Sequence, residues 1–220
     1  MDGKSPSNRQ PWFPKVISAP SNSETAMTSE NDLTEPKRPS PTKPPTSLAQ
    51  AAEQGRWNIE RLNRAYSKKG LDRPLFDFAT VGSSGKRPED VIGALRLPVF
   101  GCDIIVDVRF TPYNQYVPPW NENNLKALCK ANGLEYVHRP ELGVPKEVRD
   151  DVKSGKLSDG QFYEWYDRVV LSGTQADYLR EVVKKHRPAF LCTELGPVFC
   201  HRHRIAVFLE RELGVVGYDV

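Results

Sequence analysis

The stretch AFLCTELGPVFCHRHR, residues 189–204, sets the fold prediction. Residues 189–193 are short and mostly apolar, which predicts a buried strand, and Gly196-Pro197 predicts a loop after it. Residues 200–213 then carry apolar side chains at the spacing of a helix. A buried strand followed by a loop and a helix is the repeating unit of an α/β domain.

The same unit recurs throughout residues 71–220. Continuous apolar runs such as Ile104-Ile105-Val106 predict strands that are covered on both faces. Strands are expected at 75–81, 103–109, 134–138, 189–193 and 215–220, and helices at 89–97, from Asn121 or Asn123 to Asn132, and at 146–152, 159–171, 175–186 and 200–213. This alternation predicts a single three-layer α/β domain with a mostly parallel sheet of about five strands.

The N-terminal quarter of the chain has a different composition. Nine of the 19 prolines precede Ser47, and almost no apolar periodicity accompanies them. We therefore expect residues 1–46 to form a disordered Pro/Ser-rich tail, in which Trp12 and Phe13 are the obvious anchors for a partner. Residues 47–70 have one wet and one apolar side, which predicts an adaptor helix that lies against the domain.

Composition also narrows the class of protein. The first thirty residues lack the apolar stretch of a secretory signal, and no apolar run is long enough to span a bilayer. Four irregularly spaced cysteines suit reduced thiols rather than a disulfide framework. We therefore expect a cytoplasmic protein with no membrane partner. A formal net charge of +3 does not identify a dedicated nucleic-acid binder, and the sequence does not give the oligomeric state.

The end of the 189–193 strand is the first candidate site, because open α/β sheets bind ligands beyond the carboxyl ends of their strands. Strand alternation places Cys192 and Glu194 on one face and Thr193 on the other. In the following helix, Arg202 tops the core-facing stripe, so its guanidinium is expected to point toward the strand end.

The two thiols of this stretch have alternative interpretations. Cys200 lies at a helix N-terminus beside the cationic residues His201 and Arg202, an environment that favours a reactive thiolate. Buried packing is the competing interpretation for Cys200 and the favoured one for Cys192. His203 is expected to be a solvated helix residue.

A metal site is a further interpretation of this stretch, because Cys192, Cys200, His201 and His203 are all soft ligands. Their spacing matches neither a Cys-x₂-Cys pair nor a helical His-x₃-His pair. The sequence therefore predicts neither a metal nor another cofactor.

The second candidate site is Asp107-Val108-Arg109, at the carboxyl end of the Ile-Ile-Val strand. If this strand neighbours residues 189–194, then Asp107, Arg109, Glu194 and Arg202 are expected to converge. The arginines would bind an anion, and one carboxylate would act as general base. A structural network of salt bridges is the alternative.

Two loops complete the candidates. Gly82-Ser83-Ser84-Gly85-Lys86 has too few residues between its glycines for a Walker loop, so it predicts a βα turn in which Ser83 can still touch a ligand. The loop after Arg109 contains Tyr113, Tyr116 and Trp120, which could stack on bases or sugars. Phe162, Tyr166, Val169 and Val170 make a core stripe on their helix.

These motifs together resemble the domain of unknown function 488 family. The likeness is carried by Asp107-Val108-Arg109, Pro140-Glu141-Leu142-Gly143, Cys192-x-Glu194, and Pro197 followed by Cys200-His201-Arg202, and it covers nearly all of residues 80–220. It implies a compact α/β domain whose signature residues gather at the strand ends, and it implies no established reaction. The sequence departs from the family pattern at Ser83, where a histidine is usual, and at Asn114 and Val117.

The function expected from these residues is an enzyme, of hydrolase type, that acts on nucleic acid or a nucleotide-like anion, with DNA-repair hydrolysis as one option. Its catalytic candidates are Glu194, Cys200, His201 and Asp107, and its substrate-binding candidates are Arg109, Arg202, Ser83 and Tyr116. The alternatives are a thiol enzyme that uses Cys200 and a ligand-binding module without catalysis.

Overall fold

The computed structural model describes residues 48–194 and 200–220, and the side chains from Asn58 onward. The expected tail (residues 1–46, with Trp12 and Phe13) lies outside the described residues. The same holds for the predicted Gly196-Pro197 turn. No described helix is both long enough and apolar enough to cross a membrane.

A five-stranded sheet forms the middle layer, and every strand pair in it is parallel. The strand order is β3-β2-β4-β1-β5. The strands are β1 (Phe78–Gly82), β2 (Ile104–Asp107), β3 (Glu135–His138), β4 (Pro188–Cys192) and β5 (Gly217–Asp219). The predicted α/β class and the number of strands are confirmed. All residues of β1, β2 and β4 are buried, as their continuous apolar sequence indicates.

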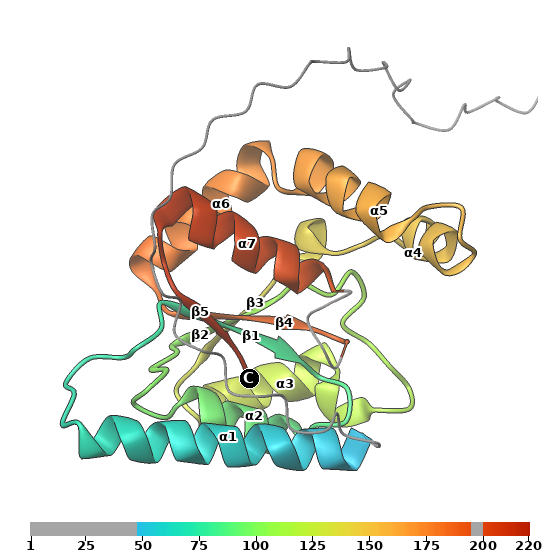
Figure 1. Cartoon of the computed structure of the whole chain (residues 1–220). Helices are drawn as coiled ribbons and strands as arrows, with labels where there is room; N and C mark the ends of the chain where they lie inside the picture. The colour runs from blue at the N-terminus through green and yellow to red at the C-terminus, as the bar shows by residue number, and fades with distance from the viewer. Residues whose placement is uncertain (1–47, 195–199) are drawn as a thin grey trace, which may run out of the picture. The chain divides into compact units, whose positions relative to one another are not determined.

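Helices cover both faces of the sheet (Figure 1). On one face lie α1 (Leu48–Lys68), α2 (Pro88–Leu95) and α3 (Glu122–Ala131), and on the other lie α4 (Lys146–Lys153), α5 (Asp159–Trp165), α6 (Gly173–Lys185) and α7 (His201–Leu213). Short 3₁₀ turns occupy Pro118–Trp120 and Pro140–Leu142. Each helix lies close to its predicted range.

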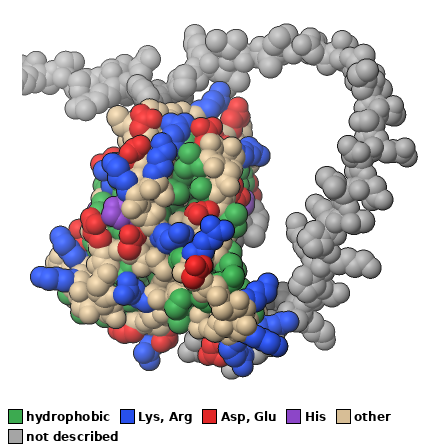
Figure 2. Space-filling model, turned by 90° about the vertical axis from the view of Figure 1, so that its left-hand side faces the viewer, with side chains coloured by type: hydrophobic (Ala, Val, Ile, Leu, Met, Phe, Trp, Pro, Cys, Tyr) green, Lys and Arg blue, Asp and Glu red, His purple; other side chains and the backbone are tan. Residues whose placement is uncertain are grey.

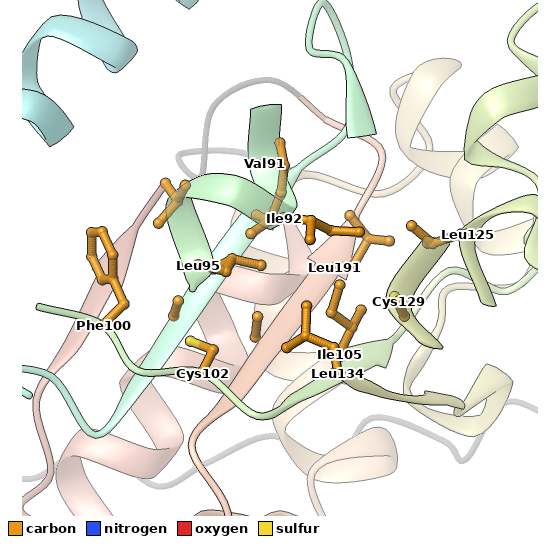
Figure 3. Close-up of a cluster of buried hydrophobic side chains, with 14 of the residues drawn as sticks. Val91, Ile92, Leu95, Phe100, Cys102, Ile105, Leu125, Cys129, Leu134 and Leu191 are labelled. Carbon is orange, nitrogen blue, oxygen red and sulfur yellow. The ribbon is translucent and has the colours of Figure 1, made fainter. Parts of the chain in front are cut away.

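Two hydrophobic clusters lie between these layers, one on each face of the sheet. Side chains such as Ile105, Leu191 and Leu125 fill the space between the sheet and α1–α3 (Figure 3). Phe190, Val106 and other residues of the opposite strand faces pack against α4–α7. Alternate residues of one strand therefore enter different clusters, and this alternation decides which polar side chains meet at the strand ends.

One predicted core position is wrong. Val169 is 42% exposed, whereas Tyr166 and Val170 are buried as expected. The reason is that α5 ends in a π-helical turn, Tyr166–Val170. Val169 lies inside this turn, and a π turn holds more residues than an α-helical turn, so its side chains do not follow the stripe that a 3.6-residue period predicts.

Candidate functional site

Four chemically reactive side chains meet where β4 ends and α7 begins. The Glu194 carboxylate Oε2 lies 2.5 Å from the Cys192 Sγ and 3.2 Å from the Cys200 Sγ. The Cys192 Sγ is also 3.5 Å from the His201 Nδ1. Cys192, Cys200 and His201 are buried, while Glu194 is exposed. We call these four residues the thiol–carboxylate cluster. Three of them, Glu194, Cys200 and His201, are sequence-predicted catalytic candidates.

The imidazole of His201 is held in a defined orientation. Its Nε2 lies 3.2 Å from the backbone carbonyl oxygen of Val108, which can only accept a hydrogen bond, so Nε2 carries the proton. The ring also packs 5.6 Å from the ring of Tyr166. In the neutral imidazole, Nδ1 therefore keeps its lone pair and directs it at the two thiols and the carboxylate.

Burial and neighbouring charges shift the proton affinities of the cluster. The protein atoms that replace water around the Glu194 carboxyl would by themselves raise its pKa, but the hydrogen bond from Cys192 and the charge of His201 outweigh this effect and lower that pKa. Burial likewise opposes protonation of His201, yet Cys200 and Glu194 raise the pKa of its imidazole. Burial raises the pKa of the Cys200 thiol strongly, which opposes the thiolate that a helix N-terminus favours.

Arg202 is fully buried behind this cluster. Its Nη1 donates to the backbone carbonyl of Glu194 at 2.7 Å and to the Cys200 Sγ at 3.3 Å, and its Nε donates to Asp219 at 3.1 Å. The side chain thus points toward the strand end, as predicted. Its guanidinium binds groups of the protein there, which is the bracing role that the sequence left as the alternative to anion binding.

Gly82 allows the end of β4 to approach β1. A Cβ atom at this position would lie 1.7 Å from the carbonyl oxygen of Glu194 and 3.0 Å from the Nη1 of Arg202. The neighbouring turn continues the ladder, because the Ser83 and Ser84 N–H groups donate to the carbonyls of Cys192 and Thr193. The segment is therefore a βα turn that fixes the position of Glu194.

Asp107 and Arg109 form a separate buried pair. The Arg109 Nε donates to the Asp107 Oδ1 at 2.9 Å, its Nη2 donates to Oδ2 at 2.5 Å and to the Trp120 carbonyl at 2.8 Å. The Tyr136 hydroxyl also donates to Asp107. β2 does neighbour β4, but Asp107 pairs with Leu191 in the ladder and faces the α1–α3 side, away from Cys192. The expected convergence of Asp107 with Glu194 does not occur.

A cavity of about 370 Å³ opens beside the thiol–carboxylate cluster. Its lining includes Cys192, Glu194 and His201 of the cluster, and Arg109. The remaining lining is Thr193, directly after β4, together with residues of α4, of α5 and of the chain between β2 and α4: Phe110, Thr111, Val144, Arg149, Val152, Lys153, Asp159, Phe162 and Tyr163. Its size is that of a small-molecule pocket.

Two basic residues of this cavity were not predicted from the sequence. Arg149 and Lys153 are exposed, lie one turn apart on α4, and form no ion pair with any residue described. Their spacing of four residues was visible in the sequence, but nothing there tied α4 to the strand ends.

Two of the other predicted ligand contacts do not line this cavity. Ser83 is buried elsewhere, and Tyr116 is 84% exposed. Trp120 is buried in the core, and His203 is exposed as expected.

A comparison with models of protein families finds a match that covers this site. The family model "Domain of unknown function DUF488" matches residues 87–209, more than half of the chain. The chain belongs to the DUF488 family. This match confirms the resemblance drawn from the sequence motifs, and it includes every residue of the thiol–carboxylate cluster. No curated protein and no solved structure matches the chain. The chemistry of this DUF488 domain therefore has to be inferred from its own side chains.

Proposed function

We propose that this domain is an enzyme that binds a phosphate-bearing, nucleotide-like anion in the cavity and hydrolyses it with Glu194 as general base. One observation carries the proposal: a carboxylate with a lowered pKa stands at the wall of a cavity that is also lined by Arg149 and Lys153, which form no ion pair with any described residue. An ionised carboxylate beside a pocket for an anion is suited to accepting a proton from an attacking water.

The anion is held mainly by Arg149 and Lys153. The sequence favoured Arg109 and Arg202, but the guanidiniums of these two residues donate hydrogen bonds to protein groups. Arg109 still lines the cavity and adds positive potential there. Arg149 and Lys153 are exposed and form no ion pair with a described residue, so they can turn toward a phosphate without losing such a pair. Binding the anion with them therefore costs less free energy than binding it with Arg109 and Arg202.

The shape of the cavity fits one nucleotide unit. Phe162 and Tyr163 supply an aromatic wall on which a base can stack. A volume near 370 Å³ suits a single unit rather than a duplex. Figure 2 shows a face on which acidic and basic side chains are interspersed, unlike the basic stripe of a duplex-binding surface. A nucleotide flipped out of a strand, as in base-removing DNA repair, would satisfy this geometry.

A thiol enzyme is the second candidate, with Cys192 as nucleophile in place of the predicted Cys200. Cys192 lines the cavity, and its Sγ is 3.5 Å from the Nδ1 of His201, which the Val108 carbonyl orients. This arrangement of thiol, imidazole and orienting acceptor is the one that activates cysteine nucleophiles.

Binding of a fluorescent single-stranded oligonucleotide, measured across salt concentrations, tests the proposed ligand. We expect Arg149→Ala/Lys153→Ala to weaken binding and to reduce the salt slope by roughly 1.4, since two phosphate contacts are lost. Lys184→Ala/Lys185→Ala removes the same charge from α6, where both lysines pair with Glu181, and should change neither value. No binding at low salt, or equal effects of the two double variants, overturns the proposal.

Turnover of oligonucleotides and nucleotides then separates the two mechanisms. Glu194→Gln should abolish hydrolysis under the leading proposal, whereas Cys192→Ser should abolish it under the thiol alternative. Iodoacetamide, which alkylates thiols, should abolish turnover only under the thiol mechanism. If the ligand binds and no substrate turns over, the domain is a binding module and the enzymatic proposal is wrong.

A further inference from the structure

The thiol–carboxylate cluster has the donor set of a transition-metal site. Its four ligand atoms, two Sγ, one imidazole nitrogen and one carboxylate oxygen, all lie within 4.8 Å of one another. Tetrahedral zinc with bonds of 2.0–2.3 Å places its ligand atoms about 3.3–3.8 Å apart. The separations between the Cys192 Sγ and the His201 Nδ1, 3.5 Å, and between the Cys200 Sγ and the Glu194 Oε2, 3.2 Å, are close to these values.

The tautomer of His201 favours metal binding. Because the Val108 carbonyl accepts a hydrogen bond from Nε2, Nδ1 is the nitrogen that faces the two sulfur atoms, and in the neutral imidazole its lone pair is free to bind a metal ion. Metal-binding histidines commonly donate their other ring N–H to a backbone carbonyl, which fixes the ring and raises its basicity. A histidine that only filled space in the core would not need this nitrogen directed at two thiols.

A cationic hydrogen-bond donor contacts one of the two sulfur atoms. The Nη1 of Arg202 donates to the Cys200 Sγ at 3.3 Å, and the guanidinium is completely buried. Such a donor stabilises a metal-bound thiolate by taking part of its negative charge. It lies behind Cys200, whereas the cavity lies on the side of Cys192, Glu194 and His201.

We propose that Cys192, Cys200, His201 and Glu194 bind one Zn²⁺ or a similar borderline-soft divalent ion. Thiolate with imidazole is the ligand combination that selects such metals. Glu194 is the replaceable ligand, since it alone is exposed, and its Oε2 must move about 1 Å from the Cys192 Sγ to reach tetrahedral spacing. Exchange of this carboxylate for water would open the fourth position toward the cavity, as in catalytic rather than structural sites.

The inference shares its residues with the proposed function but does not require the anionic ligand. The sequence did not predict the site because the ligands at 192, 194, 200 and 201 match no short metal motif. The spacing works because the end of β4 and the N-terminus of α7 lie side by side, so residues eight positions apart in the sequence become neighbours.

Metal uptake by the reduced full-length chain tests the site. After removal of metal with a chelator, titration with Zn²⁺ against a chromophoric competitor should give one saturable site per chain. Co²⁺ should add sulfur-to-cobalt charge-transfer absorption in the near ultraviolet and intense visible bands of tetrahedral Co²⁺. We expect Cys200→Ser and His201→Gln to lose the site, and Glu194→Gln to retain it with weaker affinity.

Cys102→Ala is the matched control, because Cys102 is an equally buried thiol in the other core cluster and should keep full uptake. Circular dichroism verifies that each variant is folded. If a variant does not fold, Cys192→Ser is measured in its place. The absence of saturable uptake, or uptake that survives Cys192→Ser/Cys200→Ser, overturns the inference. Arg149→Ala/Lys153→Ala should bind metal normally, so loss of anion binding with intact metal uptake refutes only the proposed function.

Discussion

Arg202 and Glu194 are joined through the backbone: the guanidinium Nη1 donates to the Glu194 carbonyl oxygen at 2.7 Å. The same guanidinium bonds to the carboxylate of Asp219 on the edge strand β5 and to the Cys200 Sγ. One buried cation therefore connects the end of β4, the start of α7 and β5. The position of the thiol–carboxylate cluster depends on this connection, because the guanidinium holds both the Glu194 carbonyl and the Cys200 Sγ.

The first prediction concerns this connection. Arg202→Leu should destabilise the domain by roughly 3 kcal/mol, because it leaves the Glu194 carbonyl and the Asp219 carboxylate without their charged donor. The measurement is urea unfolding at neutral pH. Arg211→Leu, at an exposed position of the same helix, should change the free energy of unfolding by less than about 0.5 kcal/mol. Similar values for the two variants would contradict the bracing role of Arg202.

The second prediction concerns the close contact at Gly82. Gly82→Ala should destabilise the domain by about 2 kcal/mol or more, because the added Cβ overlaps the Glu194 carbonyl oxygen and separates β1 from the end of β4. It should also weaken ligand binding in the cavity. Gly93→Ala is the control, since nothing lies within 4 Å of a Cβ there. Within α2 it should stabilise by up to about 1 kcal/mol. Thermal and urea unfolding of both variants give the comparison, and equal stability would refute the clash.

The contrast between Asp107 and Glu194 shows how far the sequence can predict this site. Alternation within a strand correctly placed Cys192 with Glu194, because a strand has a fixed period of two. The relation between strands depends on register, and the pairing of Asp107 with Leu191 puts Asp107 on the opposite face. Side-chain patterns do not contain that register when both faces of the strands are apolar.

The cavity was beyond sequence reasoning for a related reason. Its basic residues, Arg149 and Lys153, belong to a surface helix whose sequence alone shows only an amphipathic pattern. Their contribution depends on how α4 packs over the end of β4, which involves contacts far apart in the chain. The helices and strands themselves were predictable because they carry their own periodicity, and many of them are followed closely by a glycine or proline.

The third prediction concerns alkaline pH. Burial raises the pKa of the Cys102 thiol to about 12 and that of Cys129 to about 11. The folded state therefore holds these protons more tightly than the unfolded state, so stability is complete below the unfolded pKa near 8.5 and falls as pH rises toward the folded values. Each thiol contributes at most about 1.4 kcal/mol per pH unit in that window.

Urea unfolding between pH 7 and pH 11 measures this decline. Cys102→Ala should make the slope above pH 9 shallower, because one of the linked protons is removed, even though the variant starts from a lower stability at pH 7. His203→Ala, at an exposed position, should leave the slope unchanged. A slope that is identical in wild type and Cys102→Ala would show that this thiol is not linked to alkaline unfolding.

The fourth prediction concerns the buried pair of Asp107 and Arg109. Asp107→Asn keeps the shape of the side chain but removes the charge that faces the Arg109 guanidinium, so it should cost roughly 3 kcal/mol of stability. Tyr136→Phe deletes only one hydrogen bond to Asp107 and should cost about 1 kcal/mol. Asp103→Asn, an exposed residue that contacts His186 and Arg187, should cost less than about 1 kcal/mol. Urea unfolding ranks the three variants.

Because Arg109 also lines the cavity, Asp107→Asn should weaken oligonucleotide binding, whereas Asp103→Asn should not. If Asp107→Asn were as mild as Asp103→Asn, the pair would not hold the loop after β2 in place.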